Sequence, residues 1–213
     1  FKSVIATEIA TLIAWSAAKN NDRIGGLIFS SDEHHEIRPR RGKTAVLDFI
    51  GRATKHKTWA QNDGTSKQKI SKRNMTSAMA RLRKVTHPGS LVFMISDFLD
   101  MDEKAFSHLA NIARHNDIVL IKISDPIEVD LPSSGSYRLS DGEKEIQLQT
   151  SNMKTRNEYH LRYLERKDQL EKFCRSNRIH LVNISTSDDA LDALTKALGK
   201  QDTSKHISRR HAQ

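Results

Sequence analysis

The segment His87–Asp102, HPGSLVFMISDFLDMD, constrains the fold of this chain more than any other stretch. Its centre, Leu91–Ile95, is an unbroken apolar run, too short for a membrane span and too continuous for an amphipathic helix. Such a run is typical of a strand buried on both faces in a parallel sheet. Ser96 and Asp97 follow at once, which predicts a hydroxyl and a carboxylate at the carboxyl end of the strand, where open α/β sheets bind ligands.

A helix-start pattern follows that strand, with Asp100 predicted as the N-cap and Glu103 three residues later. The same order of apolar run and acid recurs at Ile118–Ile123, which is followed by Ser124 and Asp125. Strands that read as continuous apolar runs and alternate with helices predict an α/β fold. We expect a doubly wound, mostly parallel sheet with helices on both faces.

The remaining periodicity predicts the other elements of a single domain. Helices are expected over 3–19, 42–54, 70–85, 102–115, 155–176 and 188–198, and further strands over 24–29, 35–40 and 179–184. The alternating segment 135–150, with Asp141-Gly142 at its centre, predicts a β-hairpin that projects from the sheet. Gly199 is predicted to end the last helix, leaving one domain over residues 1–199 and a disordered polar tail over 200–213.

Composition limits the class of protein. The chain has 213 residues, 37% hydrophobic and 29% charged, which suits one ordinary core and is too polar for a membrane protein. Cys174 is the single cysteine, so no intrachain disulfide can form and a reducing, cytoplasmic setting is expected. Cys174 itself is predicted to be a small buried hydrophobe rather than a reactive thiol.

Positive charge is concentrated in one part of the chain. Between Arg38 and Lys84 there are fourteen Lys or Arg and two acids, Asp48 and Asp63, which gives +12 there and −3 for the rest of a chain of net charge +9. Such a segment predicts a surface that attracts polyanions or an acidic partner. The candidate partner contacts in it are Arg38, Arg40 and Arg41.

No enzyme signature is present in the sequence, neither a phosphate-binding glycine loop nor a nucleophile elbow nor an HExxH helix, so a non-enzymatic protein is expected. Two pairs, Ser96-Asp97 and Ser124-Asp125, place hydroxyl and carboxylate oxygens at two strand ends. These are ligands that Mg²⁺ prefers, and they are also common caps of a following helix. The residues alone leave both interpretations open.

The segment PGSLVFMISDFLD, preceded by the basic helix MTSAMARLRKV, resembles the bacterial domain-of-unknown-function 58 family, a branch of the von Willebrand factor type A-like domains. Further similar segments lie in the same order along roughly Phe1–Leu198: KSVIATEIATLIAWSAAKNNDRIGGLIFS, HEIRPRRGKTAVLDFI and ISDPIEVDLPSSGSYRLSDGE.

The resemblance implies a metal-ion-dependent adhesion site that holds Mg²⁺. In that site Asp97 matches the aspartate after a later strand, and Thr76, or alternatively Thr65, matches the threonine of a second loop. The resemblance places the DxSxS element, with its central strand, before Phe1, so we expect a segment upstream. Without that segment the chain lacks the central strand and the metal ligands of DxSxS.

The resemblance also implies a function. It implies a non-enzymatic module that binds a protein partner whose carboxylate completes the metal coordination, with Ser96 and Asp100 beside the contact. It further implies that this module acts together with a MoxR-type AAA+ ATPase in chaperone-like assembly or stress response.

Two other functions fit parts of the sequence. A nucleic-acid-associated protein would use the Arg38–Lys84 surface. Against this, Trp59 is the one aromatic residue interleaved with its positive charges outside the predicted helix that holds Phe49, and base stacking normally needs several. A hydrolase would use Asp97 and Asp125 as a metal-holding pair, but it lacks a third nearby acid and a candidate base.

Overall fold

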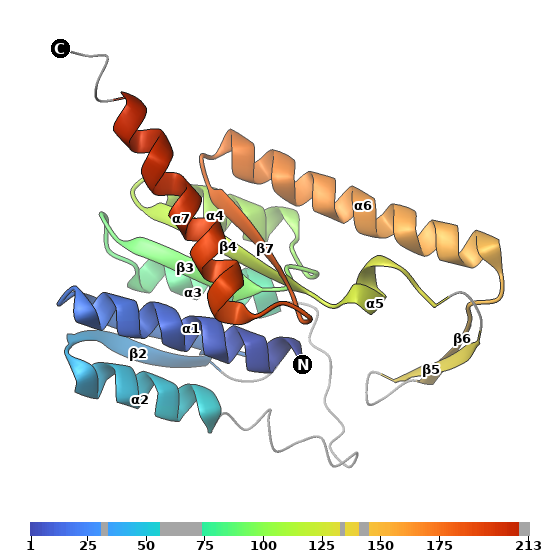
Figure 1. The fold of residues 1–213 in the computed structure, drawn as a ribbon, viewed down its shortest axis with the longest axis horizontal. Helices are drawn as coiled ribbons and strands as arrows, with labels where there is room; N and C mark the ends of the chain where they lie inside the picture. The colour runs from blue at the N-terminus through green and yellow to red at the C-terminus, as the bar shows by residue number, and fades with distance from the viewer. Residues whose placement is uncertain (31–33, 56–73, 133–134, 141–144, 209–213) are drawn as a thin grey trace.

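The structure, a computed structural model, describes residues 1–30, 34–55, 74–132, 135–140 and 145–208 (Figure 1). Its helices are α1 (Lys2–Lys19), α2 (Lys43–Thr54), α3 (Asn74–Val85), α4 (Glu103–Ala113), α5 (Pro126–Val129), α6 (Met153–Ser176) and α7 (Ala190–Ser208). Its strands are β1 (Arg23–Phe29), β2 (His34–Arg41), β3 (Leu91–Ser96), β4 (Asp117–Ser124), β5 (Ser136–Ser140), β6 (Glu145–Gln149) and β7 (His180–Ser185). The elements therefore follow the predicted order, and the short helix α5 is an addition.

The described strands form three separate sheets, whereas one sheet with a projecting hairpin was expected. β3, β4 and β7 form a parallel sheet with β4 in the middle, whereas β1 with β2 and β5 with β6 form antiparallel pairs. The predicted parallel pairing of the two apolar runs is confirmed, since Leu91 lies opposite Asp117 and Ser96 opposite Lys122. The β5–β6 pair confirms the hairpin, which lies away from the parallel sheet in Figure 1.

Helices cover both faces of the parallel sheet because alternate residues of β4 point to opposite sides. Ile118 and Leu120 pack against apolar residues of α3, α4 and α6, such as Met79, Leu109 and Leu170. Val119, Ile121 and Ile123 face the other way, toward α1 and α7, in a second core. Because helices cover both faces of the sheet, the segments that follow its strands come together at the carboxyl ends of the strands.

The start of α4 differs from the prediction. Asp102, not Asp100, is the N-cap: its carboxylate accepts a hydrogen bond from the Ala105 backbone N–H at 2.7 Å, and Asp100 is exposed in the turn before it. Asp100 and Asp102 both precede the helix. Asp100 was predicted because Glu103 follows it by three residues, the spacing of a capping box, and that prediction is wrong.

The end of α7 also differs. The helix continues through Gly199 to Ser208, so Gly199 does not end it as predicted. Glycine in a helix interior lowers helix stability by about 1 kcal/mol relative to alanine, and helix-forming neighbours can outweigh this cost. Residues 209–213 lie outside the described part of the chain.

The β1–β2 pair packs tightly on α2, and the two glycines of β1 allow the close approach. A Cβ atom on Gly26 would lie 2.7 Å from Phe49 of α2, and one on Gly25 would lie 2.9 Å from Pro39 of β2. Both glycines are therefore needed for close approach.

The structure also shows the surroundings of the single cysteine and the character of the helices. Cys174 is buried in the core on the α6 side, and this burial raises the pKa of its thiol to about 11, as expected of an inert thiol. None of the helices in the described part of the chain is long and apolar enough to cross a membrane.

Candidate functional site

The carboxyl end of the parallel sheet gathers charged and polar residues from four distant segments. Asp97 follows β3, Asp125 follows β4 and Thr186 follows β7, and all three strands run in the same direction. The two acid-bearing strands, β3 and β4, are neighbours in this sheet. This is the edge at which open α/β sheets bind ligands.

Lys2, at the first turn of α1, bridges two acids of this edge. Its ammonium donates to Asp97 Oδ2 at 2.6 Å and to Glu128 Oε1 at 2.6 Å. The Lys2 and Asp97 side chains are 33% and 31% exposed, so the bridge lies within reach of solvent. Burial acts to lower the pKa of Lys2, but the hydrogen bonds to Asp97 and Glu128 outweigh it and the net pKa lies above the ordinary value.

Asp125 both caps a helix and ties β4 to β7. Its carboxylate accepts from the Ile127 N–H at 3.1 Å, and its own N–H donates to Glu128 Oε2 at 3.2 Å, which completes a capping box. Thr186 donates its hydroxyl to the second Asp125 oxygen at 2.7 Å. The bonds from Thr186 and Ile127 hold the pKa of Asp125 below its ordinary value. Of the two interpretations left open for Ser124-Asp125, the structure shows the cap.

Thr76 binds the N-cap residue of α4 and makes no hydrogen bond to Asp97. Its hydroxyl donates to Asp102 Oδ1 at 2.6 Å, and this bond, with that from the Ala105 N–H, lowers the pKa of Asp102. Thr76 thereby joins α3 to the cap of α4. The alternative, Thr65, lies outside the described residues.

The described residues do not fit a Mg²⁺ site by themselves. Asp97 Oδ2 is bound by Lys2, and Asp97 Oδ1 accepts from the Leu99 N–H at 3.3 Å. The Ser96 hydroxyl accepts from the Phe98 N–H at 3.3 Å. Over the described ranges no group of three or more His, Cys, Asp or Glu could hold a metal ion. The cation held at Asp97 is the Lys2 ammonium.

The turn after β3 carries a strained residue. Phe98 has a φ of 55°, a left-handed conformation that is uncommon for a bulky residue, and its side chain is buried. This conformation places Asp97 and Asp100 on an exposed turn between β3 and α4.

Lys122 is a buried cation beneath the same edge. It lies on β4 with 6% of its surface exposed, and its ammonium sits 4.7 Å from the centre of the Tyr163 ring of α6. No hydrogen bond or ion pair joins it to any of the residues that the structure describes. Burial, with repulsion from Lys167 next, lowers the pKa of Lys122.

Sequence reasoning missed Lys2, Glu128, Lys122 and Thr186. Two of them left a local signal: Asp125 and Glu128 have the spacing of a capping box, and Lys122 interrupts an apolar run. Lys2 left none, because the bridge to Asp97 spans 95 positions of the chain. The arginines predicted as partner contacts, Arg38, Arg40 and Arg41, lie apart from these residues, on β2.

The comparison with protein families decides the affiliation of the chain. The family described as "Protein of unknown function DUF58" matches residues 1–169. The chain belongs to this DUF58 family. A comparison with curated proteins finds no match.

A solved structure shares the fold of this DUF58 chain. It is described as the conserved hypothetical protein BatB from Bacteroides thetaiotaomicron, with a TM-score of 0.53 and 14% sequence identity. The similarity covers 93% of this chain and 87% of that chain. At this identity the likeness establishes the fold alone.

Proposed function

We propose that this DUF58 chain is a non-enzymatic protein-binding module with a von Willebrand factor A-like layout, and that its partner docks at the carboxyl end of the parallel sheet. The observation that carries the proposal is the partly exposed Lys2 bridge between Asp97 and Glu128 at that edge. Helices cover both faces of the sheet, which leaves the edge as the position for a ligand.

The state of the acids favours binding over catalysis. Asp97 and Glu128 are both paired with Lys2, and Asp125 is held by a cap and by Thr186. A general base must lie within hydrogen-bond reach of the proton that it removes, and the donors within that reach here are Lys2, Thr186 and backbone N–H groups. These three carboxylates instead act as fixed charges, which suits recognition of a partner.

The partner class follows from the family resemblance, and we propose a MoxR-type AAA+ ATPase. Mg²⁺ enters the proposal as a competitor of Lys2, because both cations need the Asp97 carboxylate. A partner could act in the same way, by drawing Lys2 away from Asp97 and exposing the carboxylate.

The test is binding of the chain to a MoxR-type ATPase of the same organism, by biolayer interferometry with Mg²⁺ or with EDTA. Asp97→Ala is compared with Asp117→Ala, a matched control at the exposed amino end of β4, the opposite edge of the sheet. We expect Asp97→Ala to lose binding while Asp117→Ala keeps it, with both variants folded at the temperature of the assay. Equal binding by the two variants would reject the carboxyl edge as the docking site.

A further inference from the structure

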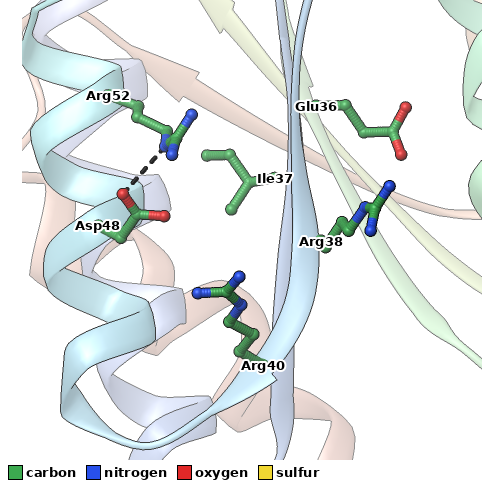
Figure 2. A pocket seen from close by; sticks show the side chains of 6 residues that line it. All are labelled: Glu36, Ile37, Arg38, Arg40, Asp48 and Arg52. Atoms are coloured by element: carbon green, nitrogen blue, oxygen red, sulfur yellow. Dashed lines mark hydrogen bonds and ion pairs between the residues drawn. The ribbon is translucent and has the colours of Figure 1, made fainter.

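A pocket lies on a different part of the molecule, between α2 and β2. It encloses about 300 Å³ and is lined by Glu36, Ile37, Arg38, Arg40, Asp48 and Arg52 (Figure 2). Ile37 is 7% exposed and forms an apolar floor, while the other residues of β2 are exposed.

The pocket reaches round the outer edge of β2. Glu36, Ile37 and Arg38 are consecutive in a strand, so their side chains alternate between its faces. Figure 2 shows Ile37 toward α2 and both Glu36 and Arg38 on the other side of the strand. A pocket lined from both faces must cross the edge of β2 that is not paired with β1.

A β-bulge places two arginines on opposite sides of that edge. Ile24 lies opposite Arg40 and Gly26 opposite Ile37, so β2 has one residue more than β1 in this interval. The extra residue reverses the alternation, and Figure 2 shows Arg40 on the α2 side and Arg38 on the other.

The two arginines carry the uncompensated charge of the pocket. Asp48 pairs with Arg52 at 3.0 Å, and Glu36 pairs with Arg81 of α3 at 3.0 Å. Arg38 and Arg40 have no ion pair with any residue in the described ranges. A guanidinium offers planar paired donors that match a carboxylate, so the pocket is suited to two acidic groups.

The backbone of β2 is available as well. β1 is its one partner strand among the described residues, which leaves backbone N–H and C=O groups along the outer edge, except the N–H that Pro39 lacks. An extended peptide added there would direct successive side chains to opposite faces. Two adjacent acidic residues would then meet Arg38 and Arg40.

We propose that the outer edge of β2 docks an extended acidic segment of a partner protein, which adds as a strand and places adjacent carboxylates on Arg38 and Arg40. The inference deepens the proposed protein-binding function and concerns a separate surface from Asp97. The pocket chemistry favours a peptide over nucleic acid, because no aromatic residue lines it for base stacking and two acids do.

The test is fluorescence anisotropy of a labelled synthetic peptide with two adjacent glutamates flanked by threonine and valine. We expect Arg38→Gln/Arg40→Gln to weaken binding by about a hundredfold, since each lost charged hydrogen bond costs about one factor of ten. The matched control, Arg114→Gln/Arg162→Gln, removes the same charge from exposed positions just after α4 and on α6, and should bind as the unsubstituted chain does.

Four further measurements decide the mode of binding. A peptide with glutamines in place of the glutamates and one with N-methylated backbone amides should both bind weakly. Tight binding by the N-methylated peptide would overturn strand addition, and tighter binding of oligothymidine than of the peptide would overturn a protein partner. Asp97→Ala should bind the peptide normally, so failure at the carboxyl edge and failure here are distinguishable.

Discussion

At the scale of single residues, Lys2 is the side chain on which the candidate site depends. Its ammonium is placed where two carboxylates from distant segments converge, as a bound cation would be. The bridge joins the start of α1 to the end of β3 and to α5, so one side chain holds three elements at the sheet edge.

We expect Lys2→Met to make the chain respond to Mg²⁺ more strongly than the unsubstituted chain, because it frees Asp97 and Glu128 for a divalent cation. The measurement is the melting temperature in Mg²⁺ and in EDTA. Lys2→Met/Asp97→Ala, which lacks the carboxylate, is the control and should not respond. An equal response of the single and double variants would contradict competition at Asp97.

The Lys2 bridge should also give a signature at high pH. Because its pKa is raised in the folded chain, the bridge stabilises the fold fully below the ordinary value of 10.5, and this contribution is lost as the pH rises through the folded-state pKa. Urea unfolding from about pH 9 to pH 12 should show the unsubstituted chain losing up to about 1 kcal/mol relative to Lys2→Met. A difference that does not change with pH would count against the bridge.

Lys122 is expected to lower stability at neutral pH, since a buried ammonium without a carboxylate partner is costly. Lys122→Met should raise the free energy of unfolding by about 1 kcal/mol near pH 7, whereas Lys104→Met, at an exposed position, should change it little. The lowered pKa of Lys122 means that the penalty is full below that pKa and gone above 10.5. A loss of stability in Lys122→Met would contradict this expectation and would show that the contact with Tyr163 outweighs the cost of burial.

At the scale of elements, the start of α4 depends on one carboxylate and one hydroxyl. Asp102→Ala removes the cap and the acceptor of Thr76, and should cost about 1–2 kcal/mol in urea unfolding. Asp100→Ala, the matched control two residues earlier, should cost almost nothing. Thr76→Val should cost about 1 kcal/mol alone and much less on top of Asp102→Ala. Additive effects would contradict the Thr76–Asp102 bond.

The sequence predicted the elements well for a physical reason. Strands buried on both faces are continuous apolar runs, and Ile118–Ile123 carries that signal locally. The cap of α4 was less predictable, since Asp100 and Asp102 both precede the helix and the choice depends on the path of the turn after Phe98. The continuation of α7 past Gly199 was missed because glycine is only a moderate cost in a helix.

At the scale of the whole molecule, sequence patterns do not determine which strands share a sheet. The apolar runs predicted β3, β4 and β7 as strands of a mostly parallel sheet but not their order, and the separation of β1–β2 as its own pair has no local signal. The candidate site was half predicted for the same reason. Asp97 and Asp125 follow their own strands, whereas Lys2 reaches the edge by the packing of α1 across the sheet.

The two proposed surfaces belong to different parts of the fold. The carboxyl edge of the parallel sheet presents acids bridged by Lys2, and the outer edge of β2 presents arginines. A partner that covers both would need a basic or metal-bound patch and an acidic strand, which gives the interface a preferred orientation.

The most direct measurement is hydrogen–deuterium exchange of the chain alone and with a MoxR-type ATPase. We expect slower exchange in peptides that cover 96–100, 125–128 and 185–188 at the carboxyl end of the sheet, and unchanged exchange in those that cover 88–90 and 115–117 at its amino end. Loss of this protection in Asp97→Ala would support docking at the Lys2 bridge. Protection confined to the amino end, or none in the presence of a bound partner, would contradict the proposed site.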